Sequence, residues 1–260
     1  MDYSLHDILV LDAPSRAAQA AKVLRVLEHF SHSAGLSLAR SSCLDVGCSS
    51  GIITRALAPH FSRVVGVDVD AHALSLTRTG ELDALAVANP PKASFASASF
   101  GAASGLALPF AEGTFDLAVC NQVYQYVPDV ARLLAEIHRI LRPRGACYFT
   151  ARNLWGIAAQ ENRLPFLAGL SPRAAAFVSR GSAAWQRRAG TLWPYHRLRA
   201  LAAQSFAVSD YTTRVLSDPA LAELFVLARY RNVLSRAPSA LLALAAAVLP
   251  THIWVLQKRA

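Results

Sequence analysis

The chain has 260 residues, of which 53% are hydrophobic and 17% are charged. This composition excludes a chain that is disordered overall, and the length allows one large domain or a domain with a small cap. The 4 cysteines form no CxxC pair and the 8 histidines lack metal-ligand spacing, so we predict buried reduced thiols and no metal site. No apolar run reaches about 18 residues, and no basic segment precedes an apolar core at the N-terminus. We therefore expect a cytoplasmic protein without a membrane-spanning helix.

The positive charge is concentrated in the C-terminal part of the chain. Residues 1–150 contain 12 Lys and Arg against 13 Asp and Glu, which leaves 14 against 4 for residues 151–260. Such an asymmetry favours an acidic partner or peripheral contact with a membrane on that side. A solvated surface rich in arginine explains it equally well.

The first 40 residues are predicted to form amphipathic helices. Apolar residues recur there at helical spacing, at Ala17, Ala20, Ala21, Leu24, Leu27 and Phe30.

A buried strand followed by a loop of small residues is predicted from Cys43 to Thr54. Gly47 and Gly51 can adopt backbone angles that other residues resist, and they allow a ligand to approach the main chain. The helix that begins near Ile52 directs unpaired N–H groups into the same space. At the carboxyl end of a parallel strand, this arrangement is typical of nucleotide-like ligand sites.

A second strand, Arg63 to Asp68, ends in an acid 17 positions after Gly51. A ribose-binding carboxylate is expected at about this distance in a dinucleotide fold, because one carboxylate can accept both ribose hydroxyls. Asp70 is the rival candidate. The apolar run places Asp68 at the tip of the strand, which leaves Asp70 to cap a helix over residues 71–78.

Three further motifs follow in order. A third strand is predicted over residues 95–102, before Leu108-Pro109-Phe110, and a fourth over Phe115 to Asn121. A helix over residues 129–141 has one apolar face, and the Pro143 to Gly145 turn leads into a fifth strand over residues 146–151.

Taken together, these motifs resemble the class I S-adenosylmethionine-dependent methyltransferases, in the branch that methylates small molecules and includes quinone-biosynthesis-like enzymes. The resemblance covers roughly Leu36 to Arg152. It implies an α/β fold: a Rossmann-like, seven-stranded, mostly parallel sheet with helices on both faces, plus a helical cap insertion.

The resemblance implies S-adenosyl-L-methionine as the cofactor and carries over a set of contacts. Asp45 would orient the glycine loop or reach the methionine amino group, Asp68 would hold the ribose, and Ser104 would meet the adenine amino group. The full set of cofactor residues is Asp45, Gly47, Cys48, Ser49, Gly51, Asp68, Val69, Ser104, Gly105, Asn121 and Gln122. Two positions depart from the family pattern: Ser49 replaces a glycine, and Ser104 replaces an acid, so the adenine contact loses its charge.

Positioning of the acceptor in line with the methyl group is the main catalytic device that this chemistry offers. An acceptor that reacts at oxygen would also need a base within hydrogen-bond reach, and we consider Tyr126, His6 and His196 as candidates. In the family, the loop that contains Tyr126 faces the methyl group.

The chain is interpreted as one domain. Residues 1–40 would form lid helices, 41–152 the cofactor-binding core, 153–194 the cap insertion, and 195–260 the remainder of the sheet. The last part would comprise a helix over residues 195–204, strands over 206–211 and 251–257, and two apolar helices over about 220–236 and 239–249.

We therefore expect a methyltransferase that acts on oxygen or carbon of a small hydrophobic or anionic acceptor, a class that includes amphiphilic molecules. The alternative is a non-catalytic protein of the same fold that binds membrane or RNA through its basic C-terminal part. No RNA-binding signature supports nucleic acid as a partner, and a homodimer is compatible with the apolar helices. An NAD-dependent oxidoreductase would need G-x-G-x-x-G, and the middle and final glycines of that motif are missing after Gly47.

Overall fold

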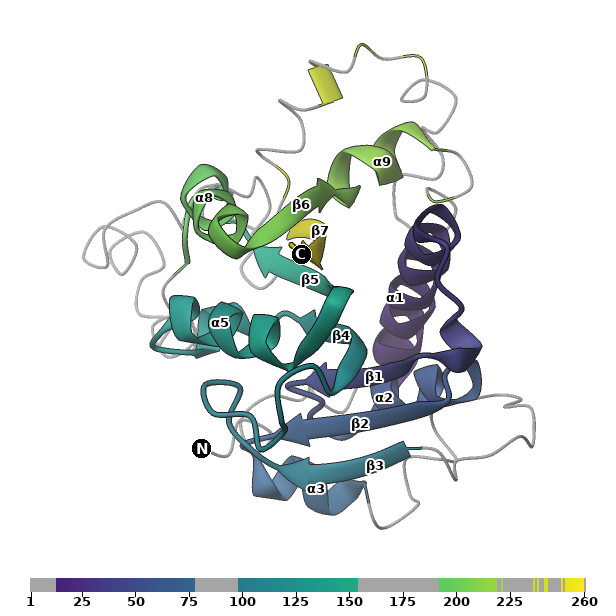
Figure 1. Ribbon diagram of the computed structural model, residues 1–260, viewed down its shortest axis with the longest axis vertical. Coiled ribbons are helices and arrows are strands. Elements are labelled where there is room, and N and C mark those ends of the chain that lie inside the picture. The colour runs from purple at the N-terminus through teal and green to yellow at the C-terminus, as the bar shows by residue number, and fades with distance from the viewer. Residues whose placement is uncertain are drawn as a thin grey trace, which may run out of the picture.

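The computed structural model describes residues 13–77, 98–153, 192–218 and 251–259, with isolated positions at 221, 236, 238, 241–242 and 249. Figure 1 shows the arrangement of its helices and strands, in which β4 follows β3 without a described helix between them. The strands are β1 (Ser42–Val46), β2 (Arg63–Asp68), β3 (Ala98–Ala102), β4 (Phe115–Asn121), β5 (Leu141–Arg152), β6 (Phe206–Asp210) and β7 (Thr251–Lys258). The α-helices are α1 (Ala13–Ala34), α2 (Ile52–Leu57), α3 (Ala71–Leu76), α5 (Val130–Ile140), α8 (Tyr195–Ser205) and α9 (Tyr211–Ser217). Short 3-10 turns occupy Leu38–Arg40, Ala58–His60 and Tyr124–Tyr126.

The strands form one seven-stranded sheet in the order β3-β2-β1-β4-β5-β7-β6. Neighbours from β3 to β5 pair in parallel, and β7 runs antiparallel between β5 and β6. The predicted Rossmann-like, mostly parallel sheet is therefore confirmed. The strand order reverses beside β1, so the carboxyl ends of β1, β2 and β4 meet at one edge.

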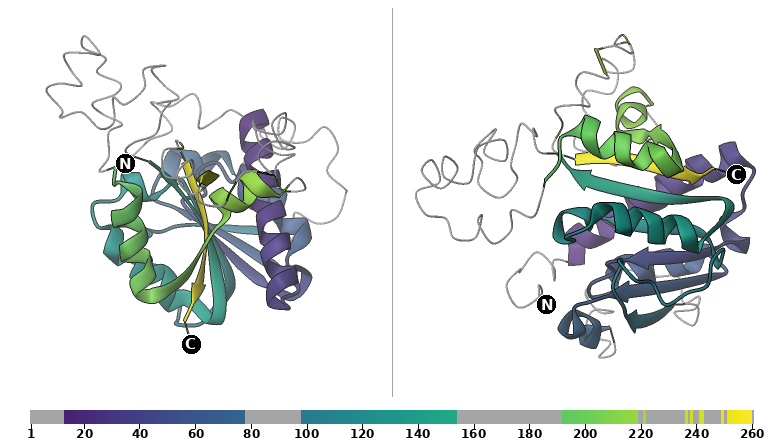
Figure 2. Two further views of the ribbon diagram at one scale, coloured as in Figure 1. Left: turned by 90° about the horizontal axis from the view of Figure 1, so that it is seen from above. Right: turned by 60° about the vertical axis from the view of Figure 1, so that its left-hand side comes forward.

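Helices cover both faces of the sheet, as the left view in Figure 2 shows. On one face, α5 and α8 pack against residues such as Leu44, Phe149 and Trp254. On the other face, α1 and α2 pack against residues such as Cys43, Val119 and Val255. The alternation of side chains along each strand explains this division, because neighbouring residues point to opposite faces.

The predicted amphipathic helix near the N-terminus is confirmed as α1. Its buried residues Ala20, Val23, Leu27 and Phe30 follow the helical period and face the sheet. The predicted buried thiols are also confirmed, since Cys43, Cys48, Cys120 and Cys147 are all buried and free of disulfides. Among the described residues, no helix has the length and apolar content needed to cross a membrane.

Three predicted boundaries were wrong. β5 begins at Leu141, not at Ala146, and residues 142–145 form an irregularity opposite Asp116 in which Arg144 has a φ of 65°. Tyr211 does not end β6. It begins α9, which we did not predict, because the carboxylate of Asp210 accepts hydrogen bonds from the N–H groups of Thr212 and Thr213 and caps that helix. The helix after the glycine loop, predicted to extend from about Ile52 to Pro59, ends at Leu57, and a 3-10 turn follows it.

Several predictions lie outside the described residues. These are His6 in the first twelve residues, most of the cap insertion, the start of the third strand at residues 95–97, and most of the two apolar helices between α9 and β7.

Candidate functional site

The glycine loop between β1 and α2 has three residues in the left-handed backbone region. Gly47 and Gly51 have φ of 77° and 75°, and Ser49 has φ of 52°. A Cβ on Gly47 would lie 2.5 Å from Val123, in the loop after β4, and a Cβ on Gly51 would lie 2.5 Å from the ring of Phe100 in β3. The two glycines are therefore required both by conformation and by the close approach of neighbouring strands.

Asp68 fastens this loop to the end of β2. One carboxylate oxygen accepts a hydrogen bond from the N–H of Ser49 at 2.7 Å, and the other accepts one from the N–H of Asp70 at 2.9 Å. Asp70 is buried and accepts from the N–H of Ala73, so it caps α3 as predicted. Asp70 is thus used by the helix cap, whereas Asp68 is half-buried at the end of the strand. Val69, between them, is 45% exposed at the same edge.

Asp45 lies beneath the glycine loop and is buried. Its carboxylate accepts a hydrogen bond of 2.6 Å from the Thr54 hydroxyl in α2. Burial raises the pKa of Asp45 to about 6; the Thr54 hydrogen bond opposes this shift, and the nearby carboxylate of Asp68 adds to it. Asp45 therefore connects β1 to α2, which orients the loop. Cys48 is also buried, and burial raises the pKa of its thiol.

Ser104 and Gly105 lie in the loop after β3. The N–H of Ala103 donates to the carbonyl of Asp68 at 3.0 Å, which places this loop next to the end of β2. A Cβ on Gly105 would lie 3.1 Å from Val46 at the end of β1, so the loop also reaches the first strand. The hydroxyl oxygen of Ser104 accepts a hydrogen bond from the N–H of Leu106.

Asn121 and Gln122 end β4 at the same edge. The Thr150 hydroxyl donates to the side-chain oxygen of Asn121 at 2.7 Å and accepts from the N–H of Gln122 at 3.0 Å. The Asn121 amide donates to the side-chain oxygen of Gln19 in α1 at 3.0 Å. Gln122 has a φ of 62°. Sequence reasoning missed Thr150 and Gln19, because neither belongs to a motif and both act through contacts far apart in the chain.

The structure brings the predicted cofactor residues to one edge, but it does not bring the catalytic candidates together. Tyr126 is 40% exposed in the 3-10 turn after β4. His196 is exposed in the first turn of α8, and no contact between it and Tyr126 is found among the described residues. His6 lies outside those residues.

An aromatic cluster extends from the β4 loop toward α8. Its ring pairs are Tyr124–Phe149 at 6.3 Å, Phe149–Trp254 at 6.1 Å, Trp254–His252 at 5.6 Å and His252–Tyr195 at 4.8 Å between centroids. Trp193 joins it, because its backbone N–H donates to the Tyr124 hydroxyl oxygen at 3.3 Å. Sequence reasoning missed His252 and Trp254, which read as ordinary residues of an apolar strand.

Three side chains of this aromatic cluster have nitrogen atoms that make no hydrogen bond to any described residue. These are both ring nitrogens of His252 and the indole nitrogens of Trp193 and Trp254, all of which are buried. Burial lowers the pKa of His252 to about 4, so its imidazole is neutral at neutral pH. Buried polar atoms of this kind normally find a partner, in the protein, in water or in a ligand.

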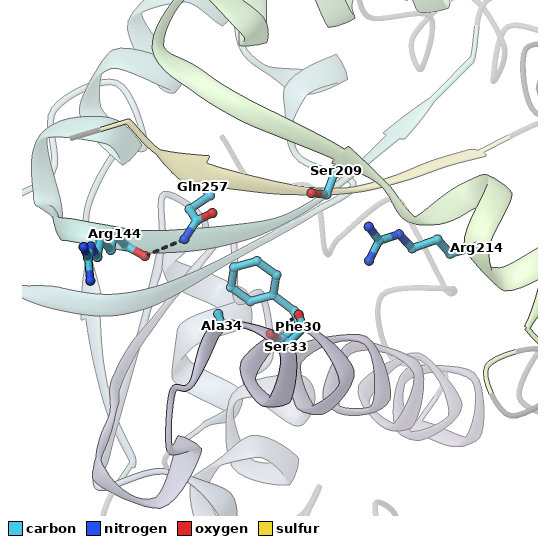
Figure 3. A pocket seen from close by; sticks show the side chains of 7 residues that line it. All are labelled: Phe30, Ser33, Ala34, Arg144, Ser209, Arg214 and Gln257. Atoms are coloured by element: carbon cyan, nitrogen blue, oxygen red, sulfur yellow. Dashed lines mark hydrogen bonds between the residues drawn. The ribbon is translucent and has the colours of Figure 1, made fainter.

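A separate hollow lies away from this edge. It has a volume of about 380 Å³ and is lined by Phe30, Ser33, Ala34, Arg144, Ser209, Arg214 and Gln257 (Figure 3). None of the predicted cofactor residues lines it, so it plays no part in the arrangement described above.

Comparison with known proteins agrees with this geometry. The model of a methyltransferase domain family matches residues 44–149, which extend from within β1 to within β5 and include the edge where the predicted residues gather. Residues 44–149 therefore carry a methyltransferase domain, within the Rossmann-like sheet described above.

Two curated relatives of this domain are ubiquinone biosynthesis O-methyltransferases. The protein from Pseudomonas paraeruginosa is 26% identical over 127 residues, with 45% of this chain and 46% of the relative covered. The protein from Aromatoleum aromaticum is 30% identical over 116 residues, with the same coverage. The chain thus spans about half the length of the curated relatives that it matches.

The fold of the methyltransferase domain is also found in a solved structure of geranyl diphosphate C-methyltransferase from Streptomyces coelicolor A3(2), in complex with Mg²⁺, geranyl diphosphate and S-adenosyl-L-homocysteine. The TM-score is 0.54 at 15% identity, with 93% of this chain and 79% of that chain covered. The methyltransferase family match over residues 44–149 supports S-adenosyl-L-methionine as the cofactor of the domain.

The residues at the carboxyl edge fit this cofactor. A carboxylate has about four lone-pair positions, and Asp68 uses two for backbone N–H groups, so the others can accept ribose hydroxyls. The exposed Val69 side chain offers an apolar surface to a planar base.

Proposed function

We propose that this chain transfers a methyl group from S-adenosyl-L-methionine to an oxygen or carbon atom of a small hydrophobic acceptor. When bound, the cofactor supplies a methyl group that its sulfonium already activates. The residues of the chain then need to bind, orient and exclude water. In this proposal Asp68 holds the ribose, Asp45 orients the loop of Gly47 to Gly51, and Asn121 and Gln122 line the methionine side.

The aromatic cluster is the observation that supports a hydrophobic acceptor. It begins at Tyr124, in the loop that faces the methyl group in the family, and its buried rings contain few polar atoms. His252 is neutral and the indole N–H groups of Trp193 and Trp254 are uncharged donors. Uncharged donors suit a hydroxyl or carbonyl oxygen on an apolar molecule better than they suit a phosphate, which prefers arginine or lysine.

Oxygen is the favoured atom of transfer, because the curated relatives at 26% and 30% identity are named O-methyltransferases. Transfer to oxygen requires removal of a proton, and Tyr126, His196 and His6 remain the candidate bases. Tyr126 is the first of these to test, because it lies on the β4 loop beside the residues assigned to the cofactor.

The proposal is tested by incubating the protein with S-adenosyl-L-methionine and three classes of acceptor: prenylated catechols, geranyl diphosphate and phosphoethanolamine. We expect release of S-adenosylhomocysteine and a methylated product with the prenylated catechol. Methylation of the polar amine alone would contradict the proposal. Cofactor binding without methylation of any acceptor would favour the non-catalytic reading instead.

Variants separate the acceptor site from the cofactor site. His252→Phe and Trp254→Phe each remove nitrogen atoms while keeping an aromatic ring, so the KM for the acceptor should rise while the affinity for S-adenosylhomocysteine stays unchanged. Tyr148→Phe is the matched control, because Tyr148 is buried on the opposite face of the sheet, among the residues that pack against α1 and α2. An acceptor KM that rises equally in the control would remove the aromatic cluster from the proposal.

A further inference from the structure

Three polar side chains of α5 hold the main chain of the loop between β3 and β4. Arg132, Glu136 and Arg139 are spaced four and three residues apart, so they project from one side of the helix. They contact the loop at Leu106, Leu108 and Phe110, which are alternate residues of that loop.

The contacts are specific in direction and length. The Arg132 side chain donates to the carbonyl of Leu106 at 3.1 Å, and the N–H of Leu108 donates to Glu136 at 2.8 Å. Arg139 donates to the carbonyls of Leu108 at 2.9 Å and Phe110 at 2.6 Å. Both backbone polar groups of Leu108, a buried residue, are thereby satisfied by side chains of α5.

Glu136 and Arg139 also pair with each other. Two Arg139 nitrogens donate to the two Glu136 oxygens, at 2.9 Å and 2.8 Å. Glu136 is 6% exposed, and its hydrogen bond from Arg139 holds the pKa of its carboxyl down at about 2. A bidentate ion pair of this kind fixes the orientation of the two side chains as well as their separation. The loop is therefore bound by side chains that are themselves held in place.

The held segment follows directly on Ser104 and Gly105. The N–H of Leu106 donates to the Ser104 hydroxyl oxygen at 3.2 Å, and the N–H of Ala107 donates to the Ser104 carbonyl at 3.0 Å. Gly105 lies against Leu133, also in α5, where an added Cβ would be 2.9 Å from its side chain. Displacement of Leu106 or Leu108 would therefore move Ser104 and Gly105.

We infer that the Arg132, Glu136 and Arg139 ladder is a positioning device that sets the selectivity of the site for adenine. The inference rests on the proposed placement of the adenine edge beside Ser104. An uncharged serine can accept or donate, so it discriminates poorly by itself. Discrimination then depends on main-chain groups at fixed positions, and the ladder is what fixes them.

The test compares two ligands that differ only in the base. S-inosylhomocysteine has an oxo group and an N–H where S-adenosylhomocysteine has an amino group and a bare nitrogen, so the donor and acceptor pattern of its edge is reversed. We expect the wild-type protein to bind S-adenosylhomocysteine about ten-fold more tightly, which corresponds to about one hydrogen bond gained or lost. In Glu136→Gln and Arg139→Gln this preference should fall to about two-fold or less.

Arg142→Gln is the matched control. Arg142 makes an ion pair of the same length, 2.8 Å, with Asp116, and a hydrogen bond to the carbonyl of Gly113, but it does not contact residues 104–110 among the described contacts. The Arg142→Gln variant should prefer S-adenosylhomocysteine over S-inosylhomocysteine by the same factor as the wild type. Arg132→Gln changes a more exposed residue of the same ladder. We expect this variant to fold even if the Glu136–Arg139 pair is essential to stability.

The outcomes are distinct. A preference that is lost in the ladder variants and kept in the control supports the inference. An equal weakening of both ligands, with a lower Tm, assigns the ladder to stability alone and overturns it, as does a wild-type protein that binds both ligands equally. Since no acceptor is present, failure of the proposed methyl transfer would not affect the result.

Discussion

The backbone N–H of Ser49 donates a hydrogen bond of 2.7 Å to the carboxylate of Asp68. This bond joins the glycine loop after β1 to the end of β2, across the point where the strand order of the sheet reverses. Because Ser49 has a φ of 52°, its backbone is held in the left-handed region that favours glycine. The carboxylate that we assign to the ribose therefore also stabilises the loop that we assign to the methionine moiety.

The Ser49 conformation yields a direct prediction. Ser49→Gly should raise the free energy of unfolding by up to about 1 kcal/mol, or leave it unchanged, because relief of left-handed strain is opposed by greater freedom of the unfolded chain. Affinity for S-adenosylhomocysteine should be kept, because the N–H to Asp68 is retained. Chemical denaturation measures the free energy of unfolding, and calorimetry measures the affinity for S-adenosylhomocysteine. A large loss of affinity would show that the Ser49 hydroxyl contacts the ligand.

Gly47→Ala should destabilise the protein through two separable effects. The left-handed φ costs about 1–2 kcal/mol for a residue with a Cβ, and the added Cβ would lie 2.5 Å from Val123. Gly113→Ala is the matched control, since Gly113 has a φ of 63° and no atom within 4 Å of an added Cβ. Denaturant unfolding should show a larger loss in the free energy of unfolding for Gly47→Ala than for Gly113→Ala. Adding Val123→Ala to Gly47→Ala should recover only the difference between these two losses. Equal losses at the two glycines would argue against a close approach of the β4 loop.

Asp45 should make stability depend on pH. Its pKa rises from an ordinary 3.8 to about 6 on folding, so the folded state binds the proton more tightly than the unfolded state. The stabilisation is complete below about pH 4 and is lost as the pH rises through about 6, by about 3 kcal/mol at 1.36 kcal/mol for each pKa unit. Asp45→Asn cannot titrate. The difference in free energy of unfolding between the wild type and this variant should therefore change across that range, and a constant difference from pH 4 to 7 would contradict the burial described above.

Thr150→Val should loosen the end of β4. The substitution keeps the shape but removes the hydroxyl that donates to Asn121 and accepts from Gln122, so it should cost about 1–3 kcal/mol. We also expect weaker binding of S-adenosylhomocysteine. Thr114→Val is the control, because the Thr114 hydroxyl donates to the nearby carbonyl of Ala111, in the loop before β4 and away from this edge. If the cofactor affinity of Thr150→Val matched that of the control, the assignment of Asn121 and Gln122 to the methionine side would fail.

The sequence was informative wherever a residue acts through its immediate neighbours. Asp70 could be assigned to a helix cap because N-caps bond to the residue three positions on, and the apolar period of α1 could be read directly. The order of the motifs also identified the parallel core and the edge at which Asp45, Asp68 and Asn121 meet.

Contacts between distant segments could not be read in the same way. Glu136 and Arg139 look like an ordinary exposed helical pair until the loop that they hold is placed against α5. His252 sits in an apolar strand, and only the packing of Tyr195 and Trp254 around it reveals an unpaired, neutral imidazole. We predicted that Tyr211 ends a strand because tyrosine favours strands. In the structure, Asp210 caps α9, so β6 ends at Asp210 and Tyr211 begins the helix.

Calorimetric titration with S-adenosylhomocysteine, in the wild type and in Asp68→Ala, tests the central claim most directly. Loss of charged hydrogen bonds to the ribose should weaken binding by at least about ten-fold in the variant. Glu112→Ala, at an exposed acid, is the control that should bind as the wild type does. We predict saturable binding to the wild type and the control, and binding by Asp68→Ala that is severely weakened or absent. A folded wild-type protein that does not bind at millimolar ligand, or an Asp68→Ala variant that binds normally, would contradict the account.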